Sequence, residues 1–156
     1  MPKITKADID HFLEGRRIAV IGVSRKEKEY SRLLFRELLK HGYDAIPVHP
    51  EATGFDGKTC YKSVKDISPA PERALIILPE DKTEQAVLDC VAAGIKEVWL
   101  HRQIGSGVSD TRAIYQAEVH GIHLITGYCL FMFLPKSSFI HKFHGRLLKM
   151  FGSYPK

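Results

Sequence analysis

Residues 94–100 read Gly-Ile-Lys-Glu-Val-Trp-Leu, a glycine followed almost at once by a short apolar run. The same arrangement recurs at residues 42–48 (Gly-Tyr-Asp-Ala-Ile-Pro-Val) and at residues 121–125 (Gly-Ile-His-Leu-Ile). Glycine readily takes the left-handed backbone conformation that often follows the last turn of a helix. Each stretch therefore predicts a helix that ends at the glycine and a buried strand that begins directly after it.

Two further apolar runs, at residues 17–23 and 74–78, complete a set of five predicted strands. Amphipathic patterns predict helices at residues 5–15 and 31–41, and another helix carries the apolar residues of segment 86–91. Strands that alternate with helices of this length imply parallel pairing through right-handed crossovers. We predict an α/β fold: a Rossmann-like, doubly wound sheet of five parallel strands in three layers, α/β/α.

The periodic pattern lapses between Pro50 and Pro71. Residues 53–58 are typical of turns, and residues 63–67 predict one short helical turn. Pro47 fits better near the end of its strand than at the centre, because it cannot donate to a ladder. A long connection inside a small domain is more often functional than idle.

The charge of the chain is concentrated at its end. The net charge is +5 over 156 residues, and the segment 136–156 holds five basic residues and no acidic one. The first 135 residues are therefore balanced. We predict a domain over residues 1–135 and a basic, amphipathic C-terminal helix over residues 136–156. The basic balance is a weak indication of nucleic-acid binding.

The cysteines and the N-terminal residues indicate a reducing compartment. Cys60, Cys90 and Cys129 are odd in number and widely spaced, which argues against disulfides and structural zinc. The first residues hold no apolar run of the kind found in signal peptides, and no run is long enough to span a membrane. We expect a cytoplasmic protein.

Ligands of open parallel sheets bind beyond the carboxyl ends of the strands. This rule points to four loops, at residues 22–30, 49–51, 79–81 and 101–107. The first loop carries Gly22 and Ser24, whose backbone N–H groups and hydroxyl suit a phosphate, with Arg25, Lys26 and Lys28 nearby. The alternative is an ordinary turn whose charges are solvated.

The pattern disfavours NAD. Ser24 and Glu27 stand where the dinucleotide fingerprint has its second and third glycines. The second strand ends in Val-His-Pro, with Glu51 displaced from the position where an acidic residue would take ribose hydroxyls. A Walker loop is also missing.

Residues 18–25 (Ile-Ala-Val-Ile-Gly-Val-Ser-Arg), 47–50 (Pro-Val-His-Pro) and 98–100 (Val-Trp-Leu) resemble the small stand-alone CoA-binding domain proteins. That family is similar to the N-terminal CoA-binding domain of the succinyl-CoA synthetase alpha subunit. The resemblance extends from about Arg16 to Cys129. Residues 129–133 and 141–144 look like an extension that some relatives carry.

The resemblance implies a role for each part of the site. The first loop meets the phosphates, His49 and Pro50 lie near the adenosine, Leu78 and Pro79 pack on the adenine, and Arg102 and Gln103 lie nearer the pantetheine. His49 replaces the commoner Asn, and Ser31 stands where relatives often have Gly. Arg25 or Lys28 would suit the 3′-phosphate. The full predicted set is Gly22, Val23, Ser24, Arg25, Lys28, Ser31, His49, Pro50, Leu78, Pro79, Arg102 and Gln103.

Other candidate sites have weaker support. Cys129 could lie near the sulfur of the ligand, although a buried and inert thiol is the favoured interpretation. The pairs His120/His123 and His141/His144 have no third metal ligand at a recognisable spacing. The tail has an apolar stripe of four residues, which favours docking on the body or on a second copy in a homodimer. A membrane-surface or nucleic-acid role for the tail is the alternative.

No set of nucleophile, base and orienting group can be assembled from the sequence. We predict a non-catalytic module that binds coenzyme A or an acyl-CoA. The alternatives are an NAD(P)-binding Rossmann enzyme and an interaction protein that acts through its basic C-terminal helix.

Overall fold

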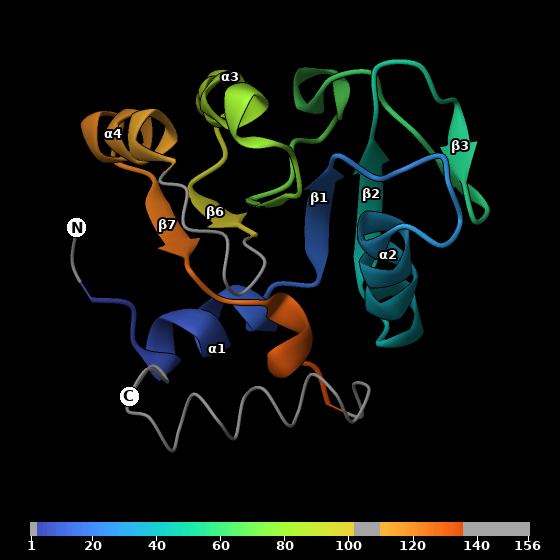
Figure 1. Ribbon diagram of the computed structural model, residues 1–156, viewed down its shortest axis with the longest axis horizontal. Helices are drawn as coiled ribbons and strands as arrows, with labels where there is room; N and C mark the ends of the chain where they lie inside the picture. Colours follow the sequence, from blue (N-terminus) through green and yellow to red (C-terminus); the bar gives the residue numbers. More distant parts are fainter. Residues whose placement is uncertain (1–2, 102–109, 136–156) are drawn as a thin grey trace.

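A computed structural model describes residues 3–101 and 110–135 as an α/β fold with a central sheet (Figure 1). All pairings in this sheet are parallel, and the strand order is β2-β1-β5-β6-β7. The strands are β1 (Arg17–Ile21), β2 (Asp44–Val48), β5 (Arg73–Ile76), β6 (Glu97–Leu100) and β7 (His123–Thr126). The predicted Rossmann-like, doubly wound sheet of five parallel strands is confirmed.

Helices cover both faces of the sheet, so the fold has three layers. In Figure 1, α3 and α4 lie above the row of strands and α1 lies below it. The helices of one face are α1 (Lys6–Glu14), α2 (Tyr30–Lys40) and the short η2 (Leu130–Met132); those of the other are α3 (Glu80–Ala92), α4 (Thr111–Val119) and the short η1 (Val64–Asp66). Each layer contributes to its own apolar cluster, so both faces of the sheet are buried.

Local sequence signals explain where the helices begin and end. Thr5 caps α1 in a capping box, in which the Thr5 N–H donates to the Asp8 carboxylate over 2.7 Å. Gly42, Gly94 and Gly121 have φ of +79°, +77° and +68°, as the repeated glycine pattern predicted.

The connection between β2 and β5 holds more structure than the sequence predicted. Residues 53–58 were expected as turns, whereas residues 54–59 form a small hairpin of the two-residue strands β3 (Gly54–Phe55) and β4 (Lys58–Thr59). The prediction was wrong on this point because two-residue strands leave no periodic pattern. Beyond the hairpin, Tyr61 forms a parallel bridge to Val48 and so extends the sheet at the carboxyl end of β2.

The strand order places a crossover beside β1. The chain passes from β1 to β2 on one side and then returns to β5 on the other side of β1. The carboxyl ends of β1 and β5 therefore flank the point at which the winding direction reverses. Such a switch point is the usual ligand position in doubly wound sheets.

The described residues leave some sequence predictions untested. The predicted C-terminal helix over residues 136–156 lies outside them, and it stays a prediction together with the domain boundary at residue 135. None of the helices in the described ranges has the length and apolar character that a membrane crossing requires.

Candidate nucleotide-binding cleft

A cleft of about 600 Å³ opens at the carboxyl ends of β1, β2 and β5, at the switch point. Three of the four predicted loops contribute to it. Seven of the twelve predicted site residues line it: Gly22, Val23, Ser24, His49, Pro50, Leu78 and Pro79. The structure therefore brings together residues that are up to 57 positions apart in the sequence, from 22 to 79.

The wall of the cleft is mainly apolar. Ile21 and Val48 supply the floor at the strand ends, and Val64 of η1 and Ala86 of α3 line it as well. The Lys65 ammonium lies 3.2 Å from the Asp89 carboxylate, which joins η1 to α3. An apolar cleft with a few polar groups is the usual environment for a flat heterocycle that carries charged substituents.

Gly22 holds the end of β1 in close contact with its neighbours on both sides. Its N–H donates to the Val48 carbonyl over 3.1 Å, and the Ile77 N–H donates to the Ile21 carbonyl over 2.8 Å. Its φ is +100°, and a Cβ built on it would lie 2.1 Å from the Ile77 carbonyl oxygen. Only glycine fits at this position. Because Gly22 has no side chain, its backbone forms this part of the cleft wall.

Internal hydrogen bonds define the shape of the first loop. The Ser24 N–H donates to Ser31 Oγ over 3.0 Å, and Ser24 Oγ accepts from the Lys26 N–H over 3.1 Å. The Ser24 carbonyl accepts from Arg32 Nη1 over 3.3 Å. A hydroxyl that accepts one bond can still donate its own hydrogen. Ser24 therefore enters the cleft with its backbone fixed and its hydroxyl able to donate. Ser31, buried on α2, supports the loop from behind.

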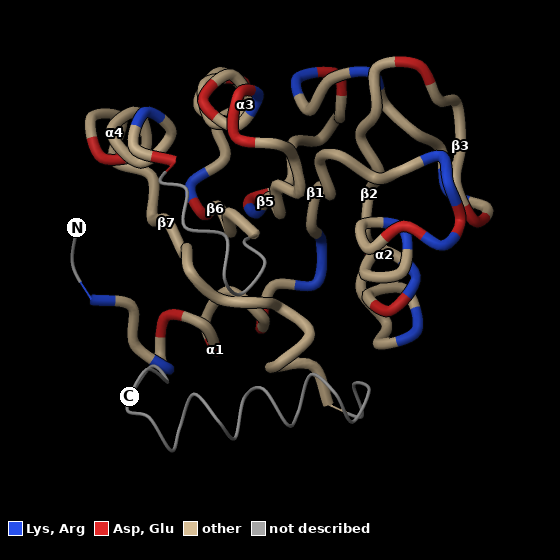
Figure 2. The backbone as a smooth tube through the Cα atoms, in the orientation of Figure 1, with Lys and Arg blue, Asp and Glu red and all other residues tan. Residues whose placement is uncertain are grey.

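Arg25 and Lys28 lie on the exposed part of the same loop and are not among the residues that line the cleft. Basic and acidic residues alternate along this segment between β1 and α2 (Figure 2). Arg25 Nη2 lies 3.1 Å from the Glu51 carboxylate, and both side chains are about two-thirds exposed. The predicted phosphate contacts of Arg25 and Lys28 therefore stay predictions. Arg102 and Gln103 lie outside the described residues.

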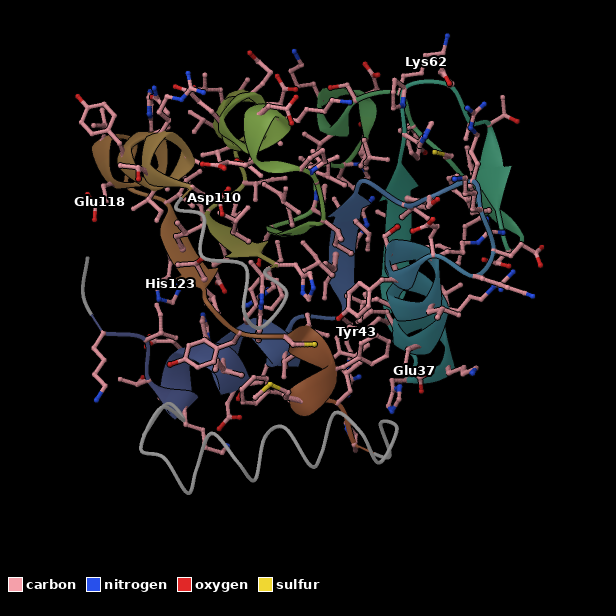
Figure 3. The ribbon with its side chains drawn as sticks, in the orientation of Figure 1. Glu37, Tyr43, Lys62, Asp110, Glu118 and His123 are labelled. Carbon is pink, nitrogen blue, oxygen red and sulfur yellow. The ribbon has the colours of Figure 1, made fainter. Side chains whose placement is uncertain are left out.

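The sequence analysis missed two lysines of the cleft. Lys62 precedes η1, and Lys82 stands on the first turn of α3; both line the cleft. Figure 3 shows Lys62 at the outer edge of the molecule. Neither lysine has an ion-pair partner within 4.0 Å among the described residues. No sequence pattern around Lys62 or Lys82 indicates a place in the cleft, because that place depends on how η1 packs against α3.

A second cluster lies on the opposite side of the sheet. The Tyr30 and His101 rings stack with centroids 4.7 Å apart, and the Tyr30 hydroxyl lies 3.0 Å from Cys129 Sγ. Burial raises the pKa of the Cys129 thiol, against an opposing effect of the hydrogen bond with Tyr30. This agrees with the interpretation of Cys129 as a buried, weakly reactive thiol. Its predicted position near the ligand sulfur is untested.

The described residues contain no cluster of three or more His, Cys, Asp or Glu side chains that could hold a metal ion. His120 Nδ1 donates to the Gln116 carbonyl over 2.9 Å, and His123 Nε2 lies 3.2 Å from the Asp8 carboxylate. His120 therefore contacts the last turn of α4 and His123 contacts the first turn of α1, so the two side chains have different partners. His141 and His144 lie outside the described residues.

A family model described as a CoA binding domain matches residues 16–135. The chain belongs to this CoA-binding domain family. The match includes the three described loops that line the cleft. The resemblance seen in the sequence is thereby confirmed.

Individual relatives agree with this assignment. The chain is 33% identical over 104 residues to the alpha subunit of ADP-forming acetate–CoA ligase II from Pyrococcus furiosus, covering 66% of this chain and 22% of that protein. It is 23% identical over 117 residues to an ADP-forming acetate–CoA ligase of Methanocaldococcus jannaschii, covering 72% and 17%. The chain thus spans about a fifth of the length of these curated relatives.

Solved structures of other proteins share the fold of this chain. A hypothetical protein from Pyrococcus horikoshii is 27% identical, with a TM-score of 0.75 and 93% of each chain covered. A dinucleotide-forming acetyl-coenzyme A synthetase from Ca. Korarchaeum cryptofilum, in complex with phosphate and ADP, is 26% identical with a TM-score of 0.64. That match covers 71% of this chain and 25% of the synthetase.

Proposed function

We propose that this protein binds coenzyme A or an acyl-CoA in the cleft at the carboxyl ends of β1, β2 and β5, as a non-catalytic module. The observation that carries the proposal is the position of the Gly22–Ser24 loop. This loop lines an apolar cleft at the switch point of the sheet, and the chain belongs to the CoA-binding domain family.

The parts of the cleft match the parts of the ligand. The Ser24 hydroxyl donates to the diphosphate, together with the Arg25 N–H, since the N–H groups of Gly22, Ser24 and Lys26 bond within the protein. Leu78 and Pro79 give an apolar surface for the adenine, with His49 and Pro50 from the loop after β2 beside the adenosine. Lys62 and Lys82 supply ammonium groups for the 3′-phosphate, a contact that the sequence alone gave to Arg25 or Lys28.

The Arg25–Glu51 pair favours CoA over NAD. Glu51 is the acidic residue nearest the end of β2, and its carboxylate lies 3.1 Å from Arg25 Nη2. A carboxylate engaged in this way is less able to accept the ribose hydroxyls that NAD presents at this position. Lys62 and Lys82 line the cleft together with Asp81 and Asp89, and the two ammonium groups suit the phosphate of a phosphorylated ribose.

The ligase activity of the longer relatives is not part of the proposal. Those relatives are an ADP-forming acetate–CoA ligase and the alpha subunit of another, whereas this chain spans about a fifth of their length.

Calorimetric titration with CoA, dephospho-CoA and NAD tests the proposal. We expect micromolar binding of CoA, weaker binding of dephospho-CoA and no measurable binding of NAD. Ser24→Ala should weaken CoA binding about tenfold, the effect of one hydrogen bond to a charged group. Thr53→Ala, at an exposed loop position outside the cleft, is the control and should leave binding unchanged. Binding of NAD with no response to CoA would refute the proposal.

A further inference from the structure

The β3–β4 hairpin reaches across to α2 through the carboxylate of Asp56. Asp56 Oδ2 accepts from Arg32 Nε over 2.7 Å, and Asp56 Oδ1 accepts from Arg36 Nε over 3.0 Å. The Arg32 side chain is only 9% exposed. The hydrogen bond from Arg32 holds the pKa of Asp56 below its usual value. A buried guanidinium is therefore fixed by a charged acceptor on the hairpin tip.

Arg32 is also in contact with the first ligand loop. Its Nη1 donates to the Ser24 carbonyl over 3.3 Å. The C=O and N–H groups of a trans peptide point in opposite directions. This hydrogen bond directs the Ser24 carbonyl toward α2, so the Arg25 N–H of the same peptide points away from α2.

The hairpin contacts the second ligand loop as well. The Arg32 guanidinium carbon lies 4.6 Å from the centroid of the Phe55 ring, a cation–π contact. The buried Phe55 ring in turn meets the His49 ring edge-on, with centroids 6.1 Å apart. Arg32 thus contacts the loop after β1 and the β3–β4 hairpin directly, and the loop after β2 through Phe55.

We propose that Arg32, held by Asp56, is a positioning residue for ligand binding: it presets the Ser24 peptide and ties this loop to the hairpin that packs on His49. This inference rests on the proposed function. Arg32 itself contacts no ligand, since it lies behind the loop and is not among the residues that line the cleft. It acts through the geometry of the residues that do.

Three conservative variants test the role of Arg32: Arg32→Lys, Asp56→Asn and Arg36→Lys. Arg32→Lys keeps the charge but loses the fork that reaches both Asp56 and Ser24. Asp56→Asn keeps the hairpin, because Asn tolerates the positive φ of 47° at this position. Arg36→Lys is the matched control: Arg36 binds the same carboxylate and contacts Glu27 further along the loop, but it does not contact Ser24.

CoA affinity is measured by calorimetry at a temperature at which each variant is folded by Trp99 fluorescence. We expect about a tenfold loss for Arg32→Lys and for Asp56→Asn, no further loss when the two are combined, and less than a twofold change for Arg36→Lys. The free Arg32→Lys protein should also show shifted amide resonances at Ser24 and Arg25, which general destabilisation would not produce. If Arg32→Lys does not fold, Asp56→Asn alone carries the comparison.

The outcomes separate this inference from the proposed function. If the unaltered protein binds CoA and all three variants bind equally well, the positioning role is refuted and the proposed function stands. If the unaltered protein binds no CoA, the proposed function fails and the positioning role fails with it.

Discussion

A Cβ atom on Gly22 would lie 2.1 Å from the carbonyl oxygen of Ile77. The two residues follow β1 and β5, the neighbouring strands at the switch point of the sheet. This backbone contact brings the first ligand loop against the wall that carries Leu78 and Pro79. The close approach of Gly22 to Ile77 therefore packs β1 against β5 and also shapes the cleft.

Replacing Gly22 by Ala should destabilise the fold by more than about 2 kcal/mol, because a strained φ adds to a clash with backbone. Gly94→Ala is the control: Gly94 has a similar positive φ of +77°, but a Cβ there meets no atom within 4 Å. It should cost only about 1 kcal/mol. Urea unfolding followed by the fluorescence of the buried Trp99 measures both. Equal losses at the two positions would contradict the close contact.

The lysines of the cleft should determine the preference for the 3′-phosphate. We expect Lys62→Met and Lys82→Met each to reduce the ratio of the CoA to the dephospho-CoA association constant by about three- to tenfold. Lys28→Met, on the exposed part of the first loop, should leave the ratio unchanged. Calorimetry with the two ligands gives the ratio directly. A loss of preference in Lys28→Met alone would return this contact to the loop that the sequence favoured.

The Arg32–Asp56 pair should make the stability of the protein depend on acid pH. Since the pKa of Asp56 is lowered on folding, its ionised form stabilises the fold above the unfolded pKa of about 4. This stabilisation is lost as the pH falls through the lowered pKa of the folded state.

Asp56→Asn should therefore cost about 1–3 kcal/mol at pH 6, and the difference from the unaltered protein should shrink as the pH falls below about 4. Asp10→Asn, which removes an exposed pair with Lys6, should cost less than about 0.5 kcal/mol. Urea unfolding at several pH values measures both. A difference for Asp56→Asn that is constant from pH 6 to pH 2 would show that ionisation of Asp56 does not stabilise the fold.

The three cysteines should react slowly in the folded protein. All are buried, and burial raises the pKa of the Cys90 thiol to about 12 and also raises the pKa values of Cys60 and Cys129. Because the thiolate is the reactive form, a disulfide reagent at pH 8 should label the native chain slowly, with Cys90 slowest. In denaturant all three should react quickly. Rapid labelling of Cys129 in the native state would reopen the question of a functional thiol.

The fold was predictable because its signals are local. A glycine directly before an apolar run, three times repeated, marks helix ends and strand starts within a few residues of one another. The loops of the cleft were also predictable, since the carboxyl ends of parallel strands share one edge. Ser24 and His49 each follow a predicted strand, and Leu78 is the last residue of another.

The rest of the site depends on contacts that the sequence does not encode locally. Arg32 resembles any charged residue of an amphipathic helix, and its role appears only when Asp56, 24 positions away, packs against it. Lys62 joins the cleft because Tyr61 bridges to Val48, and Lys82 because η1 packs on α3. The long connection after β2, which was noted for its length alone, supplies both the hairpin and one wall.

The most direct test of the account is a titration of ¹⁵N-labelled protein with CoA, followed by the amide resonances. We expect the largest shifts at Gly22, Ser24 and Leu78, with smaller ones at Lys62 and Lys82, while Asp10 on α1 stays unchanged. Shifts that concentrate on α1 or on the amino ends of the strands, or no shifts at saturating CoA, would contradict the placement of the ligand in this cleft.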